Sequence, residues 1–202
     1  MHTSPWQTAY WWYEAGYHKW HGLIPVDEFL TVKKTPYRGQ PRQLRDGTRI
    51  EPGDALLTLH FNNRFLARVQ RERGLRSPRQ AVMIFGRALM KSLCELHAAL
   101  RDEAEFADVV AVHGITWFST HGDSIGFESR PLPQGWRKTL LRWHFRLLLK
   151  VLFPHLAARE NQRLEPHEFW LSRRQLATRI AGKSSHVAQR LERYRPPRLA
   201  DG

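Results

Sequence analysis

Three polar side chains lie close together in the sequence where a mostly apolar segment ends, and they form the first candidate site. The segment Ala55–Phe61 alternates as a strand does, so His60 shares a face with Thr58. Asn62 and Asn63 come directly after it. An imidazole can transfer protons near neutral pH, and the amides could bind a hydroxylated ligand or polarise a carbonyl. The alternative is structural: a buried histidine satisfied by the backbone, and an asparagine pair that caps the next helix.

Three further residues could join this site if the sheet brings the strand ends together. Thr116 lies in the apolar strand predicted over 109–118, and Glu128 ends the strand 124–128 that we expect to pair with it. A carboxylate, a hydroxyl and an imidazole at one sheet edge would be typical of a site. Arg173 could bind a carboxylate or a phosphate. We favour a structural role for Arg173, an ion pair with Glu128 that holds the C-terminal helix on the sheet.

Other kinds of catalytic or metal chemistry find little support. The eleven histidines show no H-E-x-x-H motif and no cysteine or carboxylate partners at ligand spacing, so we expect no metal site and no cofactor. The single cysteine, Cys94, excludes an intramolecular disulfide, and its place in a helix predicts a core thiol. The chain contains no G-x-S-x-G, P-loop or G-x-G-x-x-G motif.

The segment 136–153 predicts a helix with an unusual distribution of charge. Its cations repeat every four residues and form one basic stripe: Lys138, Arg142, Arg146 and Lys150. Like charges at this spacing repel, so an anionic surface would relieve the stripe. A basic helix rich in Trp and Phe is typical of a membrane interface. Its wide apolar arc favours the alternative, in which the helix packs across the sheet and only the stripe meets water.

The elements that must position these residues follow from periodicity and turn residues. Helices are predicted over 6–21, 64–73, 78–101, 136–153 and 172–180, with Ser77 and Ser172 as helix caps. Strands are predicted over 29–33, 55–61, 109–118 and 124–128, and a hairpin over 43–50 turns at Asp46-Gly47. This order predicts an α+β fold with a single mixed or mainly antiparallel sheet of about five strands packed against helices.

The positive charge is confined to one part of the chain. The 202 residues carry a net charge of +13. Residues 1–129 have 16 Lys and Arg against 14 Asp and Glu, a net +2, whereas residues 130–202 have 16 against 5, a net +11. Such asymmetry favours an anionic partner for the C-terminal section, such as a membrane surface, a nucleic acid or an acidic glycan. Because no nucleic-acid-binding motif is present, a nucleic acid would bind there without sequence specificity.

Several short segments, in order along the chain, resemble one small bacterial domain family, the YkoP-like domain. They are Asp46-Gly47-Thr48, residues 52–63, residues 112–116, residues 125–128 and Phe169-Trp170-Leu171-Ser172-Arg173. The resemblance covers about residues 25–180. The family occurs alone or appended to polysaccharide deacetylases, so the resemblance implies a link to envelope glycan or lipid metabolism. Because 202 residues leave no room for a deacetylase domain here, a separate deacetylase or glycosyltransferase chain is the expected partner.

These observations together predict one domain over residues 1–181 and a basic, disordered tail over 182–202. We see no signal peptide and no apolar stretch of about 18 residues, so a cytoplasmic protein is expected. The favoured hypothesis is an accessory or ligand-binding module at the inner membrane surface. One alternative is an enzyme of unknown reaction using His60, Asn62 and Glu128. Another is non-specific nucleic-acid binding through residues 130–202.

Overall fold

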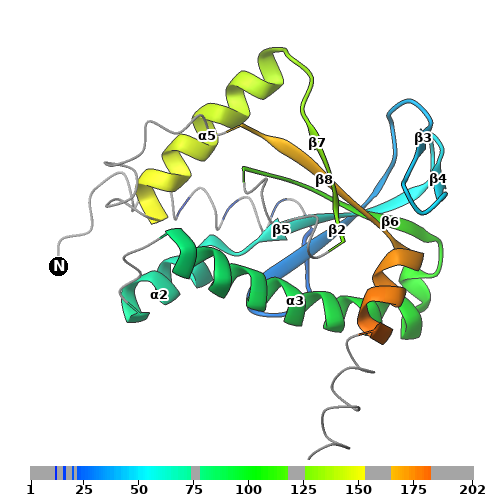
Figure 1. The fold of residues 1–202 in the computed structure, drawn as a ribbon, viewed down its shortest axis with the longest axis horizontal. Coiled ribbons are helices and arrows are strands. Elements are labelled where there is room, and N and C mark those ends of the chain that lie inside the picture. Colours follow the sequence, from blue (N-terminus) through cyan, green and yellow to red (C-terminus); the bar gives the residue numbers. More distant parts are fainter. Residues whose placement is uncertain are drawn as a thin grey trace, which may run out of the picture.

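The computed structural model describes residues 12, 16, 20, 22–73, 78–117, 126–152 and 165–182, which build a mixed sheet with helices around it (Figure 1). Of the predicted helix 6–21, only Trp12, Gly16 and Trp20 are described, and all three are helical. The first two residues of the predicted strand 124–128, the predicted cap Ser77 and the predicted tail beyond residue 182 lie outside the described residues.

Six strands form the main sheet, one more than the five or so expected, and they confirm the α+β class. The strand order is β1-β2-β5-β6-β8-β7, in which β5 and β6 are parallel and the other neighbouring pairs are antiparallel. The strands are β1 (Ile24–Pro25), β2 (Leu30–Pro36), β5 (Ala55–Phe61), β6 (Val109–Thr116), β7 (Glu128–Pro131) and β8 (His167–Ser172).

The helices lie close to their predicted bounds because each has a strong 3.6-residue apolar period. They are α2 (Asn63–Arg73), α3 (Pro78–Asp102), the 3₁₀ turn η1 (Ala104–Phe106), α5 (Trp136–Leu152) and, as the final helix of the described residues, a helix over 173–182. The predicted cap on the final helix is confirmed, since the Ser172 hydroxyl accepts the Gln175 N–H at 2.9 Å. The parallel β5–β6 pair needs a crossover, and α2 and α3 supply it.

The strand β8 changes the predicted pairing at one edge of the sheet. We expected the strand ending at Glu128 to pair with β6, but β8 lies between β6 and β7 and pairs with both. This six-residue segment begins with two polar residues, His167 and Glu168. Its local pattern therefore does not predict a central strand, which is typically a continuous apolar run. Which strands pair depends on contacts between residues far apart in the sequence, and a local pattern does not show these contacts.

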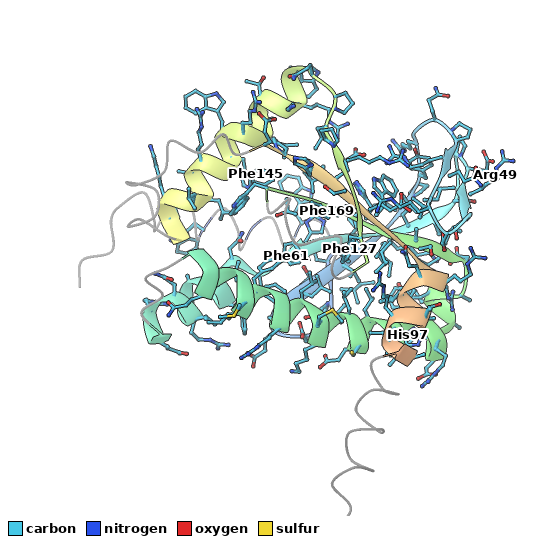
Figure 2. The ribbon with its side chains drawn as sticks, in the orientation of Figure 1. Arg49, Phe61, His97, Phe127, Phe145 and Phe169 are labelled. Carbon is cyan, nitrogen blue, oxygen red and sulfur yellow. The ribbon has the colours of Figure 1, made fainter. Side chains whose placement is uncertain are left out.

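One face of the sheet carries the main core, beneath which α3 runs (Figure 1). Phe61, Phe127 and Phe169 point into the layer between the sheet and α3 (Figure 2). The predicted stripe of α3 is confirmed by its fully buried members, Leu89, Leu93, Leu96 and Leu100. The expected core position of Cys94 is wrong, because its thiol is exposed on the outer side of α3.

The opposite face of the sheet is covered in two separate places. At one end, the short hairpin of β3 (Arg42–Gln43) and β4 (Arg49–Ile50) packs on it, and Figure 2 shows Arg49 of this hairpin at that end. The predicted Asp46-Gly47 turn is confirmed there, since Gly47 adopts a φ of +85° that favours glycine. At the other end lies α5, whose inner side packs on α2 and on Trp117. Between these two covers, part of the sheet face is left open by the residues that the structure describes.

Candidate functional site

A groove opens on this uncovered part of the sheet. Its floor is a row of register neighbours on adjacent strands: Thr58 of β5 lies beside His113 of β6, and His113 lies beside Trp170 of β8. Its walls are the connection 36–43, which leads from β2 into the hairpin, and Arg137 in the first turn of α5. The groove holds about 900 Å³, within the range of roughly 300–1,000 Å³ usual for small-molecule sites.

The indole of Trp170 organises the charged and aromatic groups of the floor. The His113 ring lies against it with 4.1 Å between ring centroids, and the Arg42 guanidinium sits 4.3 Å from its centroid. Glu168 accepts from both neighbours, since its Oε2 lies 3.2 Å from Trp170 Nε1 and 3.2 Å from Arg42. These four side chains hold one another in place, so the floor of the groove is pre-organised.

His113 is the least satisfied polar side chain of the floor. Its Nε2 is buried and finds no hydrogen-bond partner among the residues that the structure describes. Burial lowers the pKa of His113 from 6.5 to about 4, against the opposing pull of the Glu168 carboxylate, while the Arg42 and Arg137 charges lower it further. The imidazole is therefore neutral at pH 7, and its Nε2 is left without a partner in the described part of the chain.

Positive charge dominates the groove. Among the described residues, four arginines and one carboxylate, that of Glu168, line it; the arginines are Arg38, Arg42, Arg130 and Arg137. Arg42 is paired with Glu168, and Arg130 lies 3.6 Å from the Glu128 carboxylate. Arg137 is exposed and has no ion-pair partner within the described ranges. The net positive lining favours an anionic ligand.

Comparison with known proteins gives a single result. The sequence model of the YkoP domain matches residues 4–180. The chain belongs to the YkoP domain family. No curated protein and no solved structure matches the chain. The match begins earlier in the chain than the resemblance seen in the sequence, so this YkoP domain also takes in the N-terminal residues before β1.

In this YkoP domain, the first predicted cluster, at the end of β5, does not line the groove. His60 lies on β5 opposite Thr31, whose hydroxyl donates to the His60 carbonyl at 3.2 Å, and the groove is lined instead by Thr58, two residues earlier. Asn62 serves as a cap: its Oδ1 accepts the Arg64 N–H at 3.0 Å, and Asn63 begins α2. This arrangement matches the structural alternative for Asn62 rather than ligand binding.

The role of Asn62 can be measured. We expect Asn62→Ala to lower the free energy of unfolding by about 1 kcal/mol and by no more than about 2, because the N–H groups of the first α2 turn lose their acceptor. The amide also donates to the Glu28 carbonyl at 2.9 Å. Asn62→Asp keeps the acceptor and loses that donor, so its stability in urea titrations should fall between the two. An alanine variant as stable as the wild type would contradict the capping role.

The second predicted group is dispersed over the fold. Thr116 ends β6 opposite His167. Glu128 is only 2% exposed, and its carboxylate accepts the Arg45 N–H, so it fastens the hairpin to β7. Arg173 donates instead to backbone carbonyls at the end of α3, in η1 and directly after η1, so it contacts the backbone of these elements rather than Glu128. The predicted ion pair between Glu128 and Arg173 is therefore wrong.

Strand order alone keeps the predicted enzyme residues apart. β5, which carries His60, and β7, which carries Glu128, are separated by β6 and β8. At about 4.8 Å per strand step, three steps place them roughly 14 Å apart. This separation exceeds hydrogen-bond reach, so His60, Asn62 and Glu128 do not form one catalytic cluster.

The groove residues were not singled out from the sequence as a site. A signal was present in Thr58 and His113, which lie within mostly apolar strands, whereas Glu168 is one of three polar residues in β8. They share one face only when the register is known. Within the described ranges, His, Cys, Asp and Glu side chains form no group of three that could hold a metal ion. None of the helices in those ranges is long and apolar enough to cross a bilayer.

Proposed function

We propose that this YkoP domain is an accessory binding module whose groove takes an anionic saccharide, such as a uronic acid or a sugar phosphate. The observation that carries the proposal is the buried, unpartnered Nε2 of His113 on the floor of a cationic groove. A buried polar atom without a partner is uncommon in a folded protein, and a bound hydroxyl would satisfy it.

The polar groups around His113 suit a ligand with both hydroxyls and charge. The hydroxyl oxygens of Thr35 and Thr58 lie 3.1 Å apart at the groove floor, where each can donate or accept. Arg137 stands at the wall with its guanidinium uncommitted in the described part of the chain. A guanidinium binds a carboxylate or a phosphate with two parallel hydrogen bonds.

Binding suits the groove better than acid–base catalysis. A histidine whose pKa is about 4 is a weak base at pH 7, whereas a general base works best with a pKa near the operating pH. We therefore propose no reaction for the groove. The family resemblance supports a setting in envelope glycan or lipid metabolism, where a separate deacetylase or glycosyltransferase chain would supply the catalysis.

Isothermal titration of the full chain would test the ligand class. The probes are D-glucuronic acid and D-glucose 1-phosphate, with uncharged D-glucose as the comparison. We expect both anions to bind at least about tenfold more tightly than glucose, since a hydrogen bond to a charged group contributes about 1.5–3 kcal/mol. Arg137→Gln should lower the affinity for the anions by about tenfold.

A matched control exists on the same helix. Arg146 is exposed on α5 but does not line the groove, so Arg146→Gln should bind the anions as the wild type does. The proposal fails if glucose binds as tightly as the anions, if Arg137→Gln and Arg146→Gln behave alike, or if no probe gives a binding heat at millimolar concentration.

A further inference from the structure

The outer side of α5 exposes a continuous row of large apolar side chains. Four of them lie at positions i, i+4, i+7 and i+11, which fall within one narrow arc at 100° per residue. Their exposed fractions are 76% for Trp136, 61% for Leu140, 66% for Trp143 and 46% for Leu147. A soluble protein seldom leaves such a row in water unless it serves an interaction.

The same helix has a second, fully used apolar side. Phe145, Leu148 and Leu149 are buried against α2, and the Phe145 ring lies 4.9 Å from that of Trp117. Figure 2 shows Phe145 pointing inward from α5. The wide apolar arc seen in the sequence therefore splits in two. One half holds the helix on the protein, and the other half, the row just described, faces solvent.

The cations of α5 divide in the same way. Lys138 is only 6% exposed and lies 2.9 Å from the Glu165 carboxylate, and Arg142 pairs with that same carboxylate. These two members of the predicted stripe thus share one carboxylate of the same chain, which offsets one of their two positive charges. Arg146 and Lys150 remain exposed, and on the helical wheel they border the apolar row. The sequence holds no acidic residue from Arg130 to Arg159, so nothing on this helix counters them.

We infer that this outer face of α5, made of the apolar row together with Arg146 and Lys150, docks the protein on an anionic lipid bilayer. Indole rings prefer the boundary between headgroups and acyl chains, leucines enter it, and cations bind anionic headgroups. Nucleic acid would engage the cations and leave the leucines in water. The inference goes beyond the proposed ligand site and does not depend on it, because Arg146 and Lys150 lie outside the groove.

Co-sedimentation of the full chain with lipid vesicles would test the inference. The probes are vesicles of phosphatidylcholine alone and of phosphatidylcholine with about 30% phosphatidylglycerol. We expect binding to the anionic vesicles that weakens as salt is added. Each near-surface cation contributes about a fivefold change in partitioning, so Arg146→Gln with Lys150→Gln should weaken binding roughly thirtyfold. Trp136→Ser with Trp143→Ser should reduce binding to both charged and neutral vesicles.

Matched variants exist elsewhere on the surface. Lys91→Gln removes an exposed cation from α3, and Trp20→Ser removes an exposed indole outside α5; both should bind as the wild type does. The inference is overturned if neutral and anionic vesicles bind equally, if the paired α5 variants bind normally, or if Trp20→Ser abolishes binding. It is also overturned if sedimentation shows a dimer that the Trp136 and Trp143 changes dissociate, because the face would then join two copies.

Discussion

Replacing Arg173 with alanine is expected to lower the free energy of unfolding by about 2–4 kcal/mol. The Arg173 guanidinium donates to the carbonyls of Phe106 at 2.9 Å and Ala107 at 2.7 Å, and also to the Leu100 carbonyl. Carbonyls at the end of a helix have no partner within the helix, so Arg173 satisfies groups that α3 and η1 leave open. It thereby ties the final helix to the end of α3.

The variant Arg173→Lys distinguishes the effect of the positive charge on stability from the effect of the guanidinium geometry. A lysine keeps the positive charge, but its single ammonium group cannot reproduce a planar fork that reaches three carbonyls, so we expect a loss between those of alanine and the wild type. Urea titration followed by circular dichroism gives the free energies of unfolding.

The neighbouring Arg174 supplies the control. Its side chain is exposed and lies 3.3 Å from Asp46, which also accepts from Ser172 and Thr48. Asp46 therefore keeps other partners when Arg174 is removed, and an exposed ion pair contributes little. We expect Arg174→Ala to change stability by less than about 1 kcal/mol. Equal effects of the two alanine variants would refute the specific role of Arg173.

The stability of the protein should fall as the pH drops from 7 to 4.5, and His113 should cause much of the fall. Burial lowers the pKa of His113 from 6.5 in the unfolded chain to about 4 in the folded one. Between these values the unfolded chain binds the proton and the folded one does not, so acid favours unfolding. At 1.36 kcal/mol per pKa unit, the expected loss at pH 4.5 is about 2–3 kcal/mol.

His113→Gln should remove most of this dependence, because glutamine does not titrate. Burial also lowers the pKa of His144, so His144 adds a loss of the same sign, and His144→Gln serves as the comparison. The carboxylates whose pKa values are lowered, such as those of Asp46 and Asp108, lose their contribution mainly below pH 4 and stay outside the window. A His113→Gln protein as acid-sensitive as the wild type would contradict the buried, neutral histidine.

Much of the fold could be predicted from local pattern. The bounds of α2, α3 and α5 follow from apolar periods of 3.6 residues, and the turn between β3 and β4 follows from Asp46-Gly47. These signals operate within a few residues, so one chain suffices to show them. The place of β8 between β6 and β7 could not be predicted in the same way, because strand partners lie far apart in the sequence.

The candidate site was the less predictable part. His60 and Asn62, two polar residues close together in the sequence, led to the prediction of a site at the end of β5. Asn62 in fact caps a helix there. The groove instead assembles Thr58, His113 and Glu168 from three different strands. Each of these strands also carries other polar residues, so no local pattern marks these three as a set. Only the register of the sheet places these three side chains on one surface.

By itself, the sequence determined the class of fold, the family resemblance and the section of the chain that carries the charge, because composition and short-range periodicity suffice for all three. Only the tertiary structure decided which charged and apolar side chains are exposed and can contact a partner. The fold brings Glu165 to Lys138 and Arg142 and leaves Arg146 and Lys150 exposed beside the apolar row of α5. The physical reason is that burial and ion pairing depend on residues distant in sequence, and these set whether a charge binds a partner or another part of the same chain.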